Sequence, residues 1–305
     1  MANPYKQHLL ANLEERFGEL QKLEGSNSLF VIGDEAARIY LRYSKQHGRG
    51  EAFFGLRDVD LRQLQAHNSF ICFFSDIGEP IFLPYADFES LFEKAGIAQD
   101  GQYKVQLLRQ HGNTSLYIPR KGRFNVDAFI GAQTLTDSIV ATRLRENLGL
   151  NHCQVQTLIA SIGHLKGYDV WVPANNICTL DWSITSEFDV RRALPAGFES
   201  VEGALEEIDI VWVAAGRNKI EGLFEVEEST PIYSGLLRFN DVLITEPKVR
   251  NFFIVANDAR RDVFSRQVNR PTFRQSGLAE ITSFLEYANV WDWHQRLRGT
   301  HETHA

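Results

Sequence analysis

Residues 208–243 read IDIVWVAAGRNKIEGLFEVEESTPIYSGLLRFNDVL and contain two strand-like runs separated by a turn. The first run, 208–213, is apolar and rich in β-branched residues, and it carries one carboxylate, Asp209. Residues 216–218, Gly-Arg-Asn, supply turn chemistry, and residues 222–227 form the second run. The pattern therefore predicts a β-hairpin.

Three carboxylates come together if this hairpin forms. Side chains alternate between the two faces of a strand, so Glu225 and Glu227 project from one face and Asp209 can approach them from the paired strand. Carboxylates gathered in this way repel one another unless a cation joins them, and oxygen-only ligands suit Mg²⁺ or Mn²⁺ rather than zinc. From the residues alone, the alternative is that the two glutamates form the solvated face of an ordinary strand.

Asp209, fifteen intervening residues and Glu225-Val226-Glu227 resemble the catalytic signature of the PD-(D/E)xK nucleases. The order of predicted elements over residues 147–297 is similar to the core of that family. The resemblance implies that Asp209 and Glu225 bind a divalent metal ion, with Mg²⁺ as the cofactor and Mn²⁺ as a substitute. The third position, usually lysine, helps to activate water. Here it is Glu227, a variant also found among type II restriction enzymes, so Glu227 is either a further ligand or the general base.

Many members of the family also carry an acidic residue on the helix before the motif strands. The helix predicted at 153–166 offers Gln156 instead, with His152 one turn earlier, and both side chains can face the metal site. We therefore treat them as accessory candidates, with a polar helix start and an ordinary histidine as the alternative. Glu228 is expected to lie on the opposite strand face and to take no part.

The composition is typical of a globular protein with reduced thiols. A length of 305 residues allows one large domain or two of ordinary size, and a 44% hydrophobic and 11% aromatic content is ample for a packed core. Three cysteines without metal-ligand spacing, no signal peptide and no apolar run of membrane-spanning length predict a cytoplasmic protein. The net charge of −7 does not exclude a DNA partner, because local basic patches determine phosphate binding. The absence of a Gly-rich phosphate loop and of a GxSxG motif argues against an NTP-driven enzyme and a serine hydrolase.

Residues 1–135 are predicted to form a DNA-recognition domain. A helix over residues 4–24 is followed by a series of short strands with one helical insert at 87–95. Such crowding of strands predicts a mainly β, barrel-like domain. The strand rhythm and the basic loops resemble the B3-like recognition domains that are attached to some restriction enzymes.

Near residue 135 the rhythm changes to alternating helices and strands, which marks the predicted boundary between domains 1–135 and 136–305. The resemblance gives the second domain an α/β restriction-endonuclease-like core, a central mixed sheet flanked by helices. The chain is expected to end in a fraying polar tail from residue 299. The predicted elements are a connecting helix at 137–148, a helix at 153–166, strands at 168–173, 208–213 and 221–227, a helix at 231–244 with Thr230 as its N-cap, a strand at 251–256 and a helix at 258–268.

Basic residues in both domains are the candidates for DNA binding. They lie in two loops of the first domain and in an arginine-rich stretch after the last core strand, where they can contact phosphates. Exposed side chains in ordinary ion pairs are the alternative. The candidates are Arg49, Arg57, Arg120, Lys121, Arg123 and Arg266.

Together these features predict a metal-dependent endonuclease that acts on double-stranded DNA and is similar to type II restriction enzymes. Cutting both strands with one active site per chain favours a homodimer. Two alternatives stay open: a sequence-specific DNA-binding protein whose nuclease-like domain is catalytically inert, and a metal-dependent phosphoesterase acting on small nucleotides.

Overall fold

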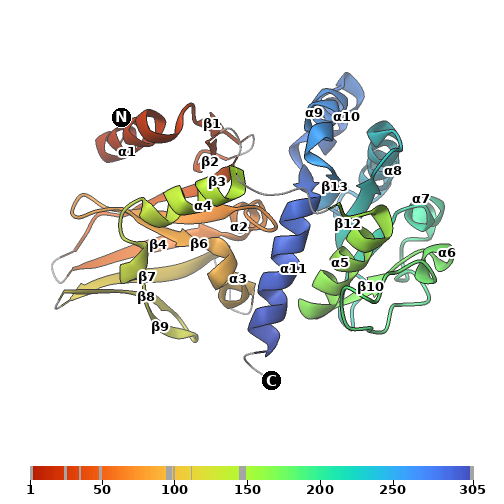
Figure 1. The fold of residues 1–305 in the computed structure, drawn as a ribbon, viewed down its shortest axis with the longest axis horizontal. Coiled ribbons are helices and arrows are strands. Elements are labelled where there is room, and N and C mark those ends of the chain that lie inside the picture. The colour runs from red at the N-terminus through yellow and green to blue at the C-terminus, as the bar shows by residue number, and fades with distance from the viewer. Residues whose placement is uncertain are drawn as a thin grey trace. The chain divides into compact units, whose positions relative to one another are not determined.

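The computed structural model describes residues 3–23, 26–33, 36–47, 50–93, 98, 100–110, 112–143 and 149–302. The chain divides into two compact units, unit 1 (residues 1–146) and unit 2 (residues 147–305), each with its own sheets and its own core (Figure 1). None of the helices among the described residues combines the length and the hydropathy needed to cross a membrane.

Unit 1 contains two sheets. The five-stranded sheet has the order β1-β2-β3-β5-β6, in which only β3 and β5 run parallel, and the four-stranded sheet is antiparallel with the order β4-β7-β8-β9. The strands are β1 (Gln21–Lys22), β2 (Leu29–Ile32), β3 (Ala37–Tyr43), β4 (Glu51–Arg57), β5 (Ser69–Phe74), β6 (Ile81–Pro84), β7 (Gln102–Gln110), β8 (Asn113–Ile118) and β9 (Gly122–Asn125).

The two sheets of unit 1 pack face to face. Phe54 on β4 lies against Phe73 on β5, with 4.8 Å between their ring centroids, and both belong to one apolar cluster drawn from the two sheets. The alternate residues of β5, Phe70 and Cys72, face a second cluster with α1 and α4. Every residue of β5 is therefore buried. The helices of this unit are α1 (Pro4–Phe17), α2 (Asp58–Arg62), α3 (Tyr85–Glu93) and α4 (Gln133–Arg143), with a 3₁₀ turn at Asp127–Phe129.

The described strands of unit 1 form a layered arrangement, and no ladder between the two sheets closes them into the predicted B3-like barrel. The physical reason lies in β5, because a strand that is apolar on both faces must be covered on both sides. The predicted N-terminal helix is also shorter than expected. It ends at Phe17 because Gly18 adopts φ 91°, and Gln21–Lys22 then pair with β2.

Unit 2 is built on one mixed sheet with the order β10-β11-β12-β13-β14. The first three strands are antiparallel neighbours and the last three are parallel, so the predicted mixed sheet and its β11–β12 hairpin are confirmed. The strands are β10 (Tyr168–Trp171), β11 (Ile210–Ala214), β12 (Ile220–Glu227), β13 (Phe252–Ala256) and β14 (Thr282–Glu286).

Helices cover both faces of this sheet (Figure 1). On one face Trp212 of β11 donates its indole N–H to the Ile159 carbonyl of α5 (3.2 Å) and packs on Trp293 of α11, 5.7 Å away. On the other face Leu223 of β12 shares an apolar cluster with Leu236 of α8. The helices are α5 (His152–Leu165), α6 (Ala174–Ile177), α7 (Glu202–Glu206), α8 (Ile232–Thr245), α9 (Arg261–Val268), α10 (Pro271–Ser276) and α11 (Tyr287–Glu302), with 3₁₀ turns at Glu199–Val201, Asp258–Arg260 and Leu278–Glu280.

The C-terminal part of unit 2 differs from expectation. The sequence analysis did not predict β14, and in place of a fraying tail from residue 299, α11 continues to Glu302. Val290, Trp293 and His294 recur at helical spacing and are each at most 1% exposed. Their burial against α5, which is a tertiary contact, stabilises a helix with little intrinsic amphipathic signal.

Gly163 in α5 provides a test of this packing. A Cβ at Gly163 would lie 2.5 Å from Nε1 of Trp212, whereas a Cβ at Gly203 in α7 would meet no atom within 4 Å. We expect Gly163→Ala to lower the free energy of unfolding by about 1–3 kcal/mol, and Gly203→Ala to raise it by about 0.5–1 kcal/mol, as helix propensity predicts. Urea unfolding followed by tryptophan fluorescence reports unit 2 alone, because all five tryptophans lie there: Trp171, Trp182, Trp212, Trp291 and Trp293. Equal effects of the two substitutions would contradict the packing.

His294 provides a second test, through pH. Its Nε2 lies 3.0 Å from Ser161 Oγ, and burial lowers the pKa of the imidazole to about 4. An unfolded histidine titrates near pH 6.5, so the unfolded chain binds the extra proton between the two pKa values. The stability of unit 2 should therefore be complete above pH 6.5 and fall towards pH 4, by at most about 1.4 kcal/mol per pH unit from this group. Compared with the wild type, His294→Gln should flatten this slope, and His8→Gln in unit 1 should leave it unchanged.

Candidate active site

One edge of the unit 2 sheet gathers the predicted site residues. The parallel strands β12, β13 and β14 end there, with Glu227, Ala256 and Glu286 in register. Because β11 is antiparallel to β12, its first residue, Ile210, pairs with Phe224 at the same edge. Asp209 directly precedes it. In sheets with parallel strands, ligands characteristically bind at the carboxyl ends of the strands.

Asp209 joins three elements. Its Oδ2 accepts a hydrogen bond from the main-chain N–H of Val226 (2.8 Å), and its Oδ1 lies 3.6 Å from Nε2 of His152 at the start of α5. Its main-chain carbonyl accepts from Nε2 of Gln156 (3.0 Å). The Asp209 side chain is 14% exposed, so solvent still reaches the site.

Glu225 is buried and forms an ion pair. Its side chain is 2% exposed, and Arg238 of α8 donates from Nε to Oε1 (2.6 Å) and from Nη2 to Oε2 (2.9 Å). Burial raises the pKa of the Glu225 carboxyl, the guanidinium of Arg238 opposes that rise, and the charges of Asp209 and Glu227 add to it. Even with this forked ion pair the pKa of Glu225 is raised to about 8, so Arg238 favours the carboxylate form while burial opposes it.

Glu227 projects from the same face of β12 towards α8. Thr230 Oγ1 donates to Glu227 Oε2, so Thr230 holds a carboxylate instead of capping α8, whose N-cap is Pro231. A Cβ at Gly235 would lie 2.9 Å from Glu227 Oε1 and 3.2 Å from Glu225 Cγ. The glycine therefore gives the two carboxylates their space. Burial raises the pKa of Glu227, and the hydrogen bond from Thr230 opposes the rise.

The two accessory candidates on α5 reach the same edge. The helix begins at His152 because Asn151 and Gln154 form a capping box. The nearby carboxylate of Asp209 is the largest influence raising the pKa of His152, and the charge of Glu228 also raises it. Gln156 is fully buried, and its Oε1 has no hydrogen-bond partner among the described residues.

Glu228 is closer to the site than the alternation of β12 indicated. The strand ends at Glu227, so alternation no longer governs the next residue. Glu228 is exposed, and its charge acts on both His152 and Tyr287. A substitution of Glu228 is therefore not a suitable control for a substitution of Glu227.

The three carboxylates share this edge, but their oxygens have other partners. The charge of Asp209 raises the pKa of both Glu225 and Glu227, which shows that the three interact. In the described part of the chain, no set of three His, Cys, Asp or Glu side chains is arranged to hold a metal ion. Arg238, for which no motif gave a signal, takes both oxygens of Glu225.

The basic candidates of unit 1 differ in their contacts. Arg57 donates to both oxygens of Asp60 (2.6 and 2.7 Å), so it forms an ion pair within its own turn. Arg120, Lys121 and Arg123 lie at the turn between β8 and β9, where Arg120 adopts φ 67° and both arginines are exposed. Arg49 lies outside the described residues.

Two arginines of the arginine-rich stretch, Arg260 and Arg261, contact groups of unit 2 itself. Arg260 donates to the carbonyl of Glu227 (2.7 Å), and Arg261 forms an ion pair with Glu286. Arg266 on α9 is exposed, and among the described residues its side chain donates to the carbonyl of Asp262 on its own helix (3.4 Å). Of these three arginines, Arg266 is the one available to an external phosphate.

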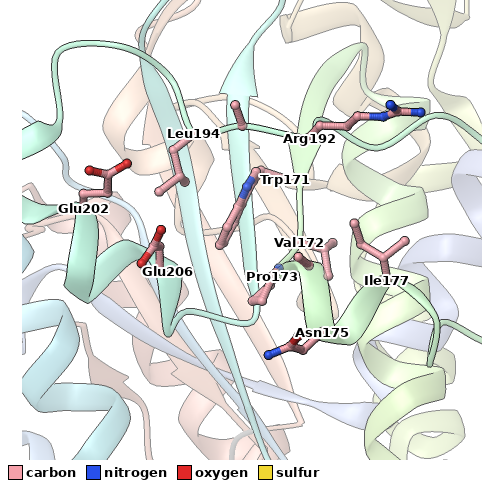
Figure 2. A pocket seen from close by; sticks show the side chains of 11 residues that line it. Trp171, Val172, Pro173, Asn175, Ile177, Arg192, Leu194, Glu202 and Glu206 are labelled. Carbon is pink, nitrogen blue, oxygen red and sulfur yellow. The ribbon is translucent and has the colours of Figure 1, made fainter.

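A pocket of about 460 Å³ opens where β10 ends, beside the candidate site. Trp171 pairs with Val211 in the sheet, which puts this end of β10 next to the start of β11. In Figure 2 the indole of Trp171 separates the carboxylates of Glu202 and Glu206 from Arg192. The sequence analysis predicted a strand at 168–173 and no site here, because no motif marks the residues that line the pocket.

Comparison with known proteins identifies one family. Residues 136–299, more than half of the chain, match the family model described as Type II restriction enzyme NmeDI C-terminal domain. No curated protein and no solved structure matches the chain. The matched region begins within α4 and contains all five strands of the unit 2 sheet.

The Glu225–Arg238 pair predicts a specific pattern of stability. Arg238→Ala leaves a buried carboxylate without its partner, so we expect unfolding of unit 2 to become easier by about 3–5 kcal/mol. The double variant Glu225→Leu with Arg238→Leu should recover most of that loss, because no charge is then left buried alone. Urea unfolding followed by tryptophan fluorescence measures each variant.

Arg191→Ala is the matched control. Arg191 pairs with Asp169 on β10 at 3.1 Å, and the two side chains are 29% and 40% exposed. Its loss should cost only about 0–1 kcal/mol. Equal costs for Arg238→Ala and Arg191→Ala would show that the Glu225 pair contributes no more than a surface ion pair.

Proposed function

Because the chain belongs to the family of the Type II restriction enzyme NmeDI C-terminal domain, we propose that residues 136–305 form a PD-(D/E)xK-like nuclease domain of the E-x-E variant. Its activity would be that of a Mg²⁺-dependent endodeoxyribonuclease on double-stranded DNA. The observation that carries the proposal is the hydrogen bond from the Val226 N–H to Asp209. It brings Asp209 against the main chain between Glu225 and Glu227, the other two carboxylates of the motif.

The residues of this edge fit a divalent cation by their chemistry. Asp209 and Glu225 would hold it, since carboxylate oxygens are the ligands that Mg²⁺ prefers, and Mn²⁺ would substitute. The unpartnered Oε1 of Gln156 also favours a group bound here. Such an ion, when bound, polarises the phosphate and lowers the pKa of a bound water. Arg238 favours the ionised form of Glu225 until then.

Glu227 serves this site as a further ligand or as the general base. Its pKa is raised by burial, which makes the carboxylate a better proton acceptor near neutral pH. Thr230 holds Oε2, so Oε1 is the atom that would take a proton from the attacking water. His152 and Gln156 would support Asp209 from α5.

We propose further that residues 1–135 recognise the DNA. The β8–β9 turn carries Arg120 and Lys121, with Arg123 at the start of β9, and such a basic hairpin end can contact a phosphate backbone. Arg266 would add a contact from the nuclease domain. A homodimer would bring one active site to each strand.

One observation favours a second candidate, a DNA-binding protein with a catalytically inert nuclease-like domain. Arg238 occupies both oxygens of Glu225, as a structural ion pair would. In that case, the wild type would bind DNA with no dependence on divalent metal and would leave it uncut.

Incubation of genomic DNA of high complexity with the protein in Mg²⁺, followed by sequencing of fragment ends, tests the proposal. The wild type should produce defined ends, and Asp209→Ala should lower the cleavage rate by about 100-fold or more, since it removes a group at the reacting charge. EDTA should abolish cutting by the wild type.

Asp169→Ala is the matched control, because Asp169 is a half-exposed aspartate on β10 of the same unit. It should cut like the wild type. Equal cutting by the wild type and Asp209→Ala would contradict the assignment, and tight binding without cutting would support the inert alternative.

A further inference from the structure

Tyr287 lies at the same sheet edge as the three carboxylates. It directly follows β14 and begins α11. In the parallel register, Glu227 of β12 is aligned with Ala256 of β13, and Ala256 with Glu286 of β14. Tyr287 comes directly after Glu286 and therefore lies at the same end of the strands as Glu227. The family motif contains no tyrosine, and the sequence analysis did not select this residue.

The hydroxyl of Tyr287 is buried and lacks a partner. The residue is 8% exposed, and its Oη has no hydrogen-bond partner among the described residues. A buried polar group without a partner costs about 1–3 kcal/mol, and native structures satisfy nearly all such groups. The Oε1 of Gln156, which belongs to the side chain that holds Asp209, is a second buried and unpartnered atom of unit 2. Both residues thus point to a bound group outside the chain.

The charges around Tyr287 define what it can bind. Burial and the charges of Glu228, Glu227 and Asp209 raise the pKa of the phenol, and Arg260 opposes this rise. The phenol therefore keeps its proton and acts as a neutral hydrogen-bond donor. Arg260 itself donates to the carbonyls of Glu227 and Thr230. A neutral hydrogen-bond donor among carboxylates can bind a ligand whose oxygens accept hydrogen bonds at this edge.

We propose that the Tyr287 hydroxyl donates a hydrogen bond to a non-bridging oxygen of the phosphodiester bound at this edge, and so positions the scissile phosphate. The inference rests on the proposed nuclease function and adds a residue to its site. A phosphodiester supplies acceptor oxygens and no competing donors. The carboxylates repel it, so an aligned donor at this edge favours the geometry in which it reacts.

Tyr287→Phe tests the inference, because it removes only the hydroxyl. We expect the rate of genomic DNA cleavage in Mg²⁺ at saturating DNA to fall about 10- to 100-fold. The urea midpoint of unit 2 should stay unchanged or rise, since an unsatisfied group has been removed. A purely structural role would instead lower the midpoint. Tyr168→Phe is the control: Tyr168 pairs with Ala214 at the opposite sheet edge and should cleave like the wild type.

A second readout separates this inference from the proposed function. In full-length protein carrying ¹³Cζ-labelled tyrosine, the resonance missing from Tyr287→Phe identifies Tyr287, and dimethyl phosphate should shift that resonance more than the resonance of Tyr168. An unshifted resonance together with wild-type cleavage by Tyr287→Phe would overturn the inference and leave the nuclease assignment standing. A shifted resonance in a wild type that cuts no DNA would support phosphodiester binding and refute the nuclease.

Discussion

The burial of two glutamates between β12 and α8 is the constraint on which unit 2 depends. Glu225 and Glu227 are each 2% exposed, and Phe224 and Val226 beside them on β12 are apolar. A buried carboxylate is tolerated only with compensating partners. Arg238 supplies them for Glu225 and Thr230 for Glu227, and Gly235 leaves the space that both side chains need. The helix that follows the motif strand is therefore part of the site.

Burying two carboxylates costs folding stability compared with apolar side chains at the same positions. Apolar residues at both positions would satisfy the core without an ion pair, so the retained carboxylates favour a functional explanation. Arg238 would have a double role in the proposed nuclease, because it favours the ionised form of Glu225 and would compete with a cation for the same oxygens. In that proposal, the balance between these two effects would decide whether the domain cuts DNA.

Unit 1 follows a different constraint, the need to cover a sheet on both faces. The residues of β5 alternate between the second sheet and the helices α1 and α4, and all of them are buried. The basic β8–β9 turn lies at one end of the four-stranded sheet. Arg120 in this turn and Arg123 at the start of β9 are exposed, which suits a contact with phosphate.

The sequence by itself determined the β11–β12 hairpin and α8, because alternation, turn residues and helical periodicity are local signals, whereas the mixed sheet was implied by the family resemblance. It also placed Asp209 and the two glutamates in one motif. Only the tertiary structure decided which groups these carboxylates contact, since Arg238 and His152 approach from separate helices. Packing alone revealed β14, α11 and the layered sheets of unit 1. Trp293 and Phe73 are apolar in any fold, and the surface that buries each of them comes from residues distant in sequence.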